Sequence, residues 1–399
     1  MTLMLNRKSV RSGACGTGAP ACRFLGIDGK MTAEGGCPTF RGGFLKLIFA
    51  FGVLGLVLAA SASRAQEPLA EGKDFVYVCK DGGNGAYEAF PDVCRLKDGR
   101  LLSVFYDGWT HVSLPTADKP NGGRVTGVFS EDEGKTWGKP FVVYDGPNDD
   151  RDPSVVQLSD GRILCNFFSL KPGPDGKGYV GLGSWLVESG DNGKTWSAAR
   201  AICNEDYYCS SPIRELPGGT LILGLYAEKN GDGYGASTTS KDGGKTWTPV
   251  VNIPNGGARL DAETDIIRLT DGRLYAAQRS PNASMRSSIS ADNGATWSTS
   301  EEMGFAGHCP YLHRATGGAV LCAFRWHAKN GTYLCVSTDE CKTWSAPILV
   351  DSFIGAYPSM VTLKDGSVLI VYYEEGGGSN IRARKFRVNG ANVDWLPFQ

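Results

Sequence analysis

Residues Ser189–Trp196 read SGDNGKTW, and four further segments of the chain repeat this spelling. The other copies are SEDEGKTW from Ser130, SKDGGKTW from Ser240, SADNGATW from Ser290 and STDECKTW from Ser337. Successive copies begin 59, 51, 50 and 47 residues apart. A repeat of about 50 residues that contains only short strand patterns predicts radial repetition of one small antiparallel sheet.

Each copy has the composition of a tight turn. Ser and Asp side chains bond turn amides, Gly adopts a left-handed backbone without a Cβ clash, and Trp anchors the turn between sheets. In the fifth copy Cys341 replaces the glycine, so we expect a strained turn there. The Ser-x-Asp spacing also fits the start of a calcium loop, but all five copies lack the remaining ligands. We therefore interpret the motif as a turn that stabilises the fold and not as a metal site.

A second repeated unit consists of two apolar runs about a turn, as in an antiparallel hairpin. Its six copies are FPDVCRLKDGRLLSVFY from Phe90, DPSVVQLSDGRILCNFF from Asp152, SSPIRELPGGTLILGLY from Ser210, TDIIRLTDGRLYAAQR from Thr264, CPYLHRATGGAVLCAFR from Cys309 and YPSMVTLKDGSVLIVYY from Tyr357. The sixth hairpin is followed by a single strand pattern, NIRARKFRV, and the first is preceded by an unpaired one, KDFVYVCK at Lys73–Lys80. Placing the first strand in the last sheet accounts for both. The sequence therefore predicts an all-β, six-bladed propeller with four-stranded antiparallel blades, in one domain over residues 70–399.

Composition narrows the class of partner. The 399 residues carry 41 basic and 42 acidic side chains, and this balance argues against a nucleic-acid partner. The sequence shows no phosphate-binding glycine loop before a helix and no histidine pair at metal spacing among its 4 histidines. We expect neither a cofactor nor a metal.

The N-terminal residues 1–65 read as an extension with a secretory signal. The run FLKLIFAFGVLGLVLAA, residues 44–60, is apolar, follows basic residues and precedes SASRA, where Ser63 and Ala65 fit a small-x-small cleavage rule. We expect removal near Ala65, a secreted or periplasmic protein, and no membrane span afterwards. An uncleaved anchor is the alternative, although the run is somewhat shorter than the ~20 residues that a span requires.

Nine of the 12 cysteines follow the predicted cleavage site, and this odd number prevents complete pairing. Several lie in apolar strand patterns, which favours buried free thiols over a disulfide framework or a metal site. Pairs Cys203 with Cys209 and Cys335 with Cys341 remain possible bridges.

Equivalent ends of the six hairpins should surround a central funnel. Eight residues before the turn stand Phe90, Asp152, Ser210, Glu263, Cys309 and Tyr357, and eight after it stand Tyr106, Phe168, Tyr226, Arg279, Arg325 and Tyr373. The polar members differ from blade to blade, so the fold does not require them individually. Together with the adjacent Arg151, Glu374, Glu88 and His308, they form the candidate site.

These residue types favour an anionic substrate. Arginines offer forked donors to a carboxylate or sulfate. A tyrosine near a glutamate suits a sugar that carries a carboxylate beside the scissile bond, because a phenol attacks without the charge repulsion that a carboxylate nucleophile would meet.

The five Ser-x-Asp-x-Gly-x-Thr-Trp motifs, known as Asp-boxes, resemble those of the sialidase (neuraminidase) superfamily. The resemblance extends over essentially the whole predicted propeller. ETDIIRLTDGRLYAAQRS is similar to the sialidase blade that carries the catalytic glutamate and one arginine of the triad, which implies these roles for Glu263 and Arg279. AYPSMVTLKDGSVLIVYYEEG is similar to the blade that begins with the nucleophile, which implies that role for Tyr357. The resemblance implies a glycoside hydrolase that removes a terminal acidic sugar, sialic acid first among them, from a glycan.

Two elements of the family pattern differ here. The first blade reads EAFPD, so Ala89 occupies the position of the first triad arginine. Arg151 has the equivalent register one blade later and is the candidate substitute, and Arg325 is the candidate third member of the triad by position. The family's acid/base aspartate comes from the loop after the first hairpin, where Asp118 is the nearest candidate and Asp107 the next; Asp152 competes with both.

Two other functions stay open. The missing arginine favours a hydrolase for another acidic glycan, or a lyase in which Tyr357 or His308 removes a proton beside a uronate carboxylate. A non-catalytic carbohydrate-binding propeller would bind glycan without turnover.

Overall fold

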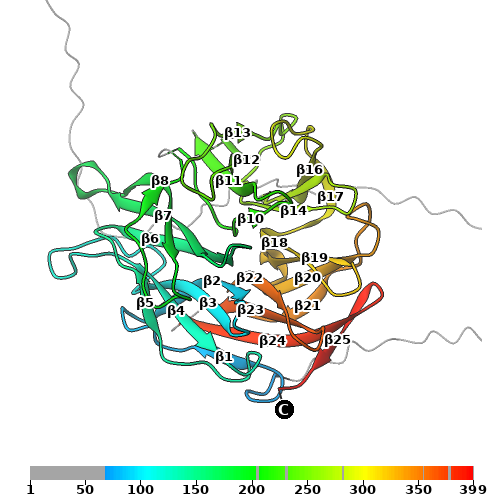
Figure 1. Cartoon of the computed structure of the whole chain (residues 1–399), viewed down its shortest axis with the longest axis horizontal. Coiled ribbons are helices and arrows are strands. Elements are labelled where there is room, and N and C mark those ends of the chain that lie inside the picture. The colour runs from blue at the N-terminus through cyan, green and yellow to red at the C-terminus, as the bar shows by residue number, and fades with distance from the viewer. Residues whose placement is uncertain are drawn as a thin grey trace, which may run out of the picture. The chain divides into compact units, whose positions relative to one another are not determined.

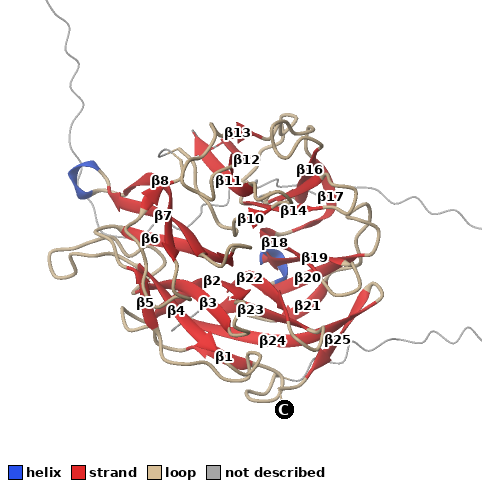
Figure 2. Ribbon diagram, viewed as in Figure 1, coloured by secondary structure: helices blue, strands red, loops and turns tan. Residues whose placement is uncertain are grey.

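The computed structural model describes residues 68–203, 206–229, 232–280, 283–353, 355–375 and 379–398. The predicted signal segment lies outside these residues. Gln66–Gln399 form one compact unit, in which six antiparallel sheets follow one another around a ring (Figure 1). Strands dominate the described residues, and only the 3-10 turns η1 (Pro174–Gly176) and η2 (His327–Lys329) are helical (Figure 2). The predicted six-bladed fold is confirmed.

The first three blades are consecutive in sequence. Blade 1 comprises β2 (Tyr87–Arg95), β3 (Leu101–Gly108), β4 (Arg124–Ser130) and β5 (Phe141–Tyr144). Blade 2 comprises β6 (Asp149–Gln157), β7 (Ile163–Pro172), β8 (Tyr179–Ser189) and β9 (Arg200–Ala201). Blade 3 comprises β10 (Arg214–Glu215), β11 (Leu221–Lys229), β12 (Asp232–Ser240) and β13 (Val251–Asn252).

The last three blades complete the ring. Blade 4 comprises β14 (Thr264–Arg268), β15 (Leu274–Gln278), β16 (Ser284–Ser290) and β17 (Glu301–Ala306). Blade 5 comprises β18 (His308–Arg314), β19 (Val320–Trp326), β20 (Gly331–Ser337) and β21 (Ile348–Asp351). Blade 6 comprises β22 (Gly355–Thr362), β23 (Val368–Glu374), β24 (Asn380–Asn389) and β1 (Val76–Cys79), and β25 (Asn392–Leu396) also pairs with β24.

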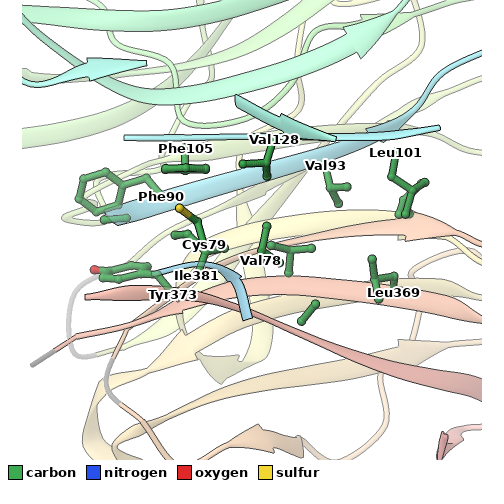
Figure 3. Close-up of a cluster of buried hydrophobic side chains, with 14 of the residues drawn as sticks. Val78, Cys79, Phe90, Val93, Leu101, Phe105, Val128, Leu369, Tyr373 and Ile381 are labelled. Atoms are coloured by element: carbon green, nitrogen blue, oxygen red, sulfur yellow. The ribbon is translucent and has the colours of Figure 1, made fainter. Parts of the chain in front are cut away.

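The ring closes between the two ends of the folded chain. Val76 of β1 pairs with Ala383 of β24, so the N-terminal strand completes the last blade, as the sequence predicts. A buried cluster then joins blade 6 to blade 1: Figure 3 shows Phe105 and Val128 of blade 1 facing Ile381 and Leu369 of blade 6. Each blade packs mainly on its neighbours, so this cluster holds the ring closed. Truncating one of its large apolar side chains to Ala should lower the free energy of unfolding by about 2–5 kcal/mol.

The Asp-box motif forms a turn that satisfies its own carboxylate. Asp191 accepts hydrogen bonds from the Thr195 amide at 2.9 Å, the Thr195 hydroxyl at 2.6 Å and the Ser189 hydroxyl at 2.8 Å. These bonds, led by that from the Thr195 hydroxyl, lower the pKa of Asp191 well below its usual range. Gly193 has φ +83°, and the corresponding Cys341 keeps the left-handed backbone at φ +64°, which is the strain expected there.

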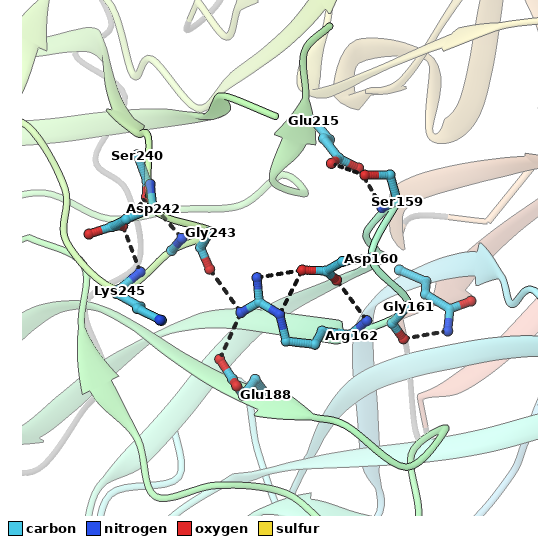
Figure 4. Close-up of polar contacts among 12 residues, drawn as sticks. Ser159, Asp160, Gly161, Arg162, Glu188, Glu215, Ser240, Asp242, Gly243 and Lys245 are labelled. Carbon is cyan, nitrogen blue, oxygen red and sulfur yellow. Dashed lines mark hydrogen bonds and ion pairs between the residues drawn. The ribbon is translucent and has the colours of Figure 1, made fainter. Parts of the chain in front are cut away.

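Polar contacts between blades hold these turns in place. Arg162, in the hairpin turn of blade 2, contacts Asp160 at 2.9 Å and the Gly243 carbonyl of the next Asp-box at 3.1 Å (Figure 4). Glu188 accepts a further bond from Arg162 at 3.4 Å. The charged residues at these turns therefore serve to hold neighbouring blades together.

All nine cysteines of the described residues are free. The Cys203–Cys209 and Cys335–Cys341 bridges that the sequence left open are not formed: Cys203 Sγ contacts the Tyr207 carbonyl at 3.4 Å, and Cys335 pairs across the sheet with Cys322. Burial raises the pKa of the Cys209 thiol to about 12, which suits a buried apolar side chain. Among the described residues, no helix has the length and apolar character needed to cross a membrane.

Candidate active site

Four of the six inner strands enter the funnel through the same distortion. Phe90, Asp152, Cys309 and Tyr357 each precede a proline and have φ of 53°, 48°, 48° and 38°. The strand register shifts at each of these positions, so the residue one place earlier opposes the second strand, as Arg151 opposes Phe168. Because proline cannot donate to the sheet ladder, a bulge forms there, and positive φ outside glycine costs free energy. Register counted from the turn alone is therefore wrong by one residue in these four blades.

Blade 4 has no such bulge, and its hairpin keeps Glu263 beside Arg279. Thr264 pairs with Gln278, and the Arg279 amide donates to the Glu263 carbonyl at 2.9 Å. The side chains also meet, with Arg279 Nη1 2.8 Å from Glu263 Oε1. Arg279 Nη2 lies 2.7 Å from Asp261 Oδ2. The guanidinium is thus held between two carboxylates of its own blade.

Tyr357 comes from blade 6 and donates its phenolic hydrogen to the same Glu263 Oε1. The second oxygen, Oε2, accepts the Cys309 amide of blade 5 at 3.0 Å. Burial, followed by the negative charges of Glu263 and Asp152, raises the pKa of Tyr357 well above its usual value. Tyr357 is therefore a neutral phenol with a carboxylate placed to take its proton.

Arg325, on β19, differs from the other arginines of the cluster. Its guanidinium lies 5.7 Å from the Tyr357 ring centroid, and Nη1 approaches the Gly355 carbonyl at 3.4 Å. It forms no ion pair with a carboxylate of the described residues, and its buried Nε has no partner there. A partly buried cation without a counter-ion, beside a second arginine, favours binding of an anion.

Arg151 is buried with its charge already compensated. It lies 3.5 Å from Asp149 and 3.8 Å from Asp152, and its Nη1 donates to the His111 carbonyl. Its guanidinium is 5.1 Å from the ring centroids of both Phe90 and Tyr106. The arginine proposed by register to replace the missing one is thus 4% exposed and engaged with the protein.

The aspartates considered for acid/base catalysis lie in different environments. Asp152 is buried, its Oδ1 has no hydrogen-bond partner among the described residues, and burial raises its pKa to about 7. Asp107 is buried but committed to Arg124 and Thr126, each at 2.9 Å. Asp118 is exposed and contacts no charged partner within the described part of the chain. Of the three, only Asp152 acts with Glu263 on the pKa of Tyr357, and it lines a narrow axial cavity together with Tyr357.

Of the remaining predicted residues, His308 lies at the cluster, whereas Glu374 and Glu88 are bound elsewhere in their blades. His308 lies near Arg279 and Arg325; burial and then these cations lower its pKa to about 3. Its ring stacks parallel to that of His327 with 6.1 Å between centroids. Glu374 instead pairs with Arg382 and Asn380 at the outer side of blade 6. Glu88 is buried in blade 1, where it accepts the Gly82 amide at 2.9 Å.

A cavity of about 850 Å³ opens beside Asp261, between blades 3 and 4. Glu228, Arg259, Asp261 and Arg286 are among the residues that line it. Burial raises the pKa of Asp261 to about 7, and a hydrogen bond with Glu228 acts in the same direction. Asp261 lines this cavity and is paired with Arg279, so there is space for a ligand next to the Glu263, Arg279 and Tyr357 side chains.

Comparison with known proteins identifies the architecture. Residues 121–309 match the model of the BNR repeat-like domain. This match lies within the six-bladed propeller, whose fold is sialidase-like. No curated protein matches the chain.

Solved structures share the fold of this BNR-repeat propeller at low sequence identity. A protein of unknown function from Dyadobacter fermentans aligns with TM-score 0.67 and 23% identity, covering 80% of this chain and 100% of that one. The NanB sialidase from Streptococcus pneumoniae aligns with TM-score 0.64 and 14% identity, covering 82% and 72%. An intramolecular trans-sialidase from Ruminococcus gnavus aligns with TM-score 0.62 and 15% identity, covering 81% and 99%.

The BNR-repeat propeller also holds site residues that the sequence did not single out. His111, in the loop between β3 and β4, is close enough to Arg151, Arg325 and Arg279 for all three cations to lower its pKa. The Tyr87 hydroxyl contacts His111, and Glu375 accepts a hydrogen bond from that hydroxyl. Asp261 forms an ion pair with Arg279. The sequence does carry a signal for His111, because it lies in the loop that is the predicted source of the acid/base group, but it is not the aspartate that the family pattern predicts there.

Proposed function

We propose that this propeller is an exo-acting glycoside hydrolase of sialidase type. It releases a terminal acidic sugar from a glycan, and sialic acid is the leading candidate. The observation that carries the proposal is the hydrogen bond from the Tyr357 phenol to Glu263 Oε1, on a carboxylate that also binds Arg279. The fold shared with proteins named sialidase and trans-sialidase supports the same reaction class. The N-terminal signal, a sequence prediction, would place the enzyme outside the cytoplasm.

In the first step, the Tyr357 oxygen attacks the anomeric carbon while Glu263 takes the phenolic proton. The bond to the leaving glycan breaks, and its oxygen receives a proton from an acid of the site. Water then replaces the tyrosine oxygen on the anomeric carbon, and Glu263 returns the proton to Tyr357. A neutral nucleophile fits this substrate class because a carboxylate attacking beside the sugar's carboxylate would meet like-charge repulsion.

Arg325 and Arg279 form the proposed clamp for the sugar carboxylate. Arg325 has no carboxylate partner among the described residues, so an anionic group would supply its missing counter-charge. Arg279 is already fixed by Asp261 and Glu263, which presents its remaining surface in one orientation. The first blade has alanine, the fully buried Ala89, at the position of the family's first triad arginine, so that position contributes no arginine to the clamp.

The test is hydrolysis of a fluorogenic α-sialoside by the full chain and by Tyr357→Phe. We expect turnover by the unaltered protein and its loss in the variant, whereas Tyr333→Phe, which removes a hydroxyl from blade 5 away from the cluster, should keep full activity. Hydrolysis that survives in Tyr357→Phe would contradict the proposal. Tight glycan binding without turnover would identify a carbohydrate-binding propeller instead.

A second function, a lyase acting on a uronate, is favoured by one observation. His308 lies beside Arg279 and Arg325, and its lowered pKa keeps it neutral, as a proton-abstracting base must be. An arginine-bound uronate carboxylate would acidify the neighbouring carbon. Release of an unsaturated, ultraviolet-absorbing product from a polyuronate would identify this activity.

A further inference from the structure

His111 is held in place by a loop that folds onto buried groups. The Trp109 and Thr110 amides both donate to the Ser113 hydroxyl, at 3.0 and 3.1 Å. The Ser113 amide in turn approaches Asp149 Oδ2 at 3.2 Å, and Arg151 donates to the His111 carbonyl. The loop is therefore anchored to blade 2 at the histidine itself and at Ser113.

The imidazole also has a defined orientation. Nδ1 lies 2.8 Å from the Tyr87 hydroxyl oxygen, and that hydroxyl donates to Glu375 Oε1 at 3.3 Å. Because the Tyr87 hydrogen is directed to the carboxylate, its oxygen accepts from Nδ1–H, and this network assigns the lone pair to Nε2. Glu375, Tyr87 and His111 thus form a chain that leaves one basic ring nitrogen for another partner.

The ring stands at the mouth of the candidate site. It packs edge-on against Phe90 with 5.5 Å between centroids, and Phe90 contacts the Tyr357 ring at 4.7 Å. Partial burial of the ring, followed by the charges of Arg151, Arg325 and Arg279, lowers the pKa of His111 to about 4. In the free protein the imidazole is therefore neutral at pH 7, and a bound carboxylate would offset the arginine charges and favour the imidazolium.

We propose that His111, held by Tyr87 and Glu375, is the acid/base residue of the hydrolase, an inference that rests on the proposed function. As imidazolium it donates the Nε2 proton to the glycosidic oxygen while the bond to the anomeric carbon breaks. As imidazole it then takes a proton from the water that forms the new bond to that carbon, as the bond to Tyr357 breaks. The proton given to the leaving group is thus replaced by one from water, and no other reactant is needed.

The two aspartates are less suited to this step. Asp118 is exposed and has no charged partner among the described residues that would hold it at the site. Asp152 is 4% exposed, lines the narrow axial cavity beside Arg151, and itself has the left-handed backbone that precedes Pro153. His111 reaches solvent at the mouth, where a leaving sugar and an attacking water both need a proton partner.

The test compares two substrates that carry the same sialic acid, one on an aryl group and one on an oligosaccharide. An aryl oxygen leaves without protonation, whereas a sugar oxygen requires it. We expect His111→Ala to lower kcat/KM by about 10²- to 10⁴-fold on the oligosaccharide and by less than about 10-fold on the aryl sialoside. Added azide, a nucleophile that needs no base, should restore kcat on the aryl substrate and yield the sialyl azide.

Control variants separate the role of His111 from a structural effect. His111→Gln should repeat the pattern, and an unchanged melting temperature would show that the loop stays folded. Tyr87→Phe should give a smaller loss on the oligosaccharide only, whereas the matched Tyr333→Phe should give none. Asp118→Asn and Asp152→Asn should show no leaving-group dependence and no rescue by azide.

The outcomes distinguish the two proposals. Equal losses on both substrates, no loss, or leaving-group dependence in an aspartate variant would overturn the role of His111 while the hydrolase function stands. No turnover of either substrate by the unaltered protein would overturn the proposed function itself, and the role of His111 with it.

Discussion

The phenol of Tyr357 and the carboxylate of Glu263 share a hydrogen bond although 94 residues separate them and they belong to blades 6 and 4. The bond exists because two neighbouring features aim both side chains at the axis. A left-handed residue at Tyr357, with φ 38°, turns its ring inward, and the regular hairpin of blade 4 holds Glu263 beside Arg279. Glu263 Oε1 accepts from both partners, so the phenol, the carboxylate and the guanidinium act as one unit.

Glu263→Gln should lower sialoside hydrolysis by about 10²- to 10⁴-fold, because the amide cannot take the Tyr357 proton. In a Tyr357→Phe background the same substitution should cause little further loss, since the two residues serve one step. Steady-state kinetics of the two single variants and the double variant measure this. Losses that multiply in the double variant would show that the residues act independently.

Arg325→Ala should reduce kcat/KM for an anionic sugar by about 10- to 100-fold, because a hydrogen bond to a charged group contributes about 1.5–3 kcal/mol. Arg325→Lys should recover only part of the loss, since lysine lacks the forked donor geometry. Arg151→Ala is the contrasting variant: it leaves the buried Asp149 and Asp152 without their cation and should lower the melting temperature. A normal kcat/KM for Arg325→Ala would contradict the clamp.

Glu88 should make stability fall as pH rises. The pKa of Glu88 is raised from 4.5 to about 8 in the folded protein, and burial is the main cause of this rise. Between these values the folded state binds more protons than the unfolded state, so the free energy of unfolding decreases by at most about 1.4 kcal/mol per pH unit. Glu88→Gln should flatten this slope in denaturant titrations at pH 5 and pH 8. An unchanged slope would show that Glu88 is ionised in the folded protein.

Gly294→Ala should destabilise the fourth Asp-box turn by about 1–3 kcal/mol. Gly294 has φ +88°, and a Cβ there would lie 2.7 Å from Ile222 Cδ1. The matched control is Cys341→Ala, because that turn already accommodates a Cβ at φ +64° and should lose about 1 kcal/mol or less. Thermal or denaturant unfolding measures both, and an equal loss at the two positions would exclude backbone strain as the cause.

Much of the candidate site was accessible from sequence because it depends on local pairing. The position of Glu263 beside Arg279 follows from equal distances to the Asp271 turn in a hairpin without a bulge. The same count fails in the blades of Asp152 and Tyr357, where a residue before proline adopts positive φ and shifts the pairing by one. Nothing in the alternation of apolar residues marks such a bulge, although the shared X-Pro step is a clue in retrospect.

The partners of individual charges were beyond sequence reasoning. Glu374 reads like a rim residue next to Tyr373, yet it turns outward to Arg382 and Asn380. Arg151 and Arg325 look interchangeable along the chain, but one is buried between Asp149 and Asp152 and the other has no carboxylate partner among the described residues. His111 lies in a loop whose path is set by contacts with Asp149 and Arg151 of the next blade.

The sequence by itself determined the number of blades, the ring closure by the strand at Val76–Cys79 and the turn role of the Asp-boxes, because each depends on repeated short-range patterns with a fixed period. Only the tertiary structure decided which polar side chains meet at the axis and which of them are already neutralised. That outcome depends on burial and on electrostatic contacts between residues of different blades, such as Glu263 with Tyr357 and His111 with three arginines. Such long-range contacts leave no periodic trace in the chain.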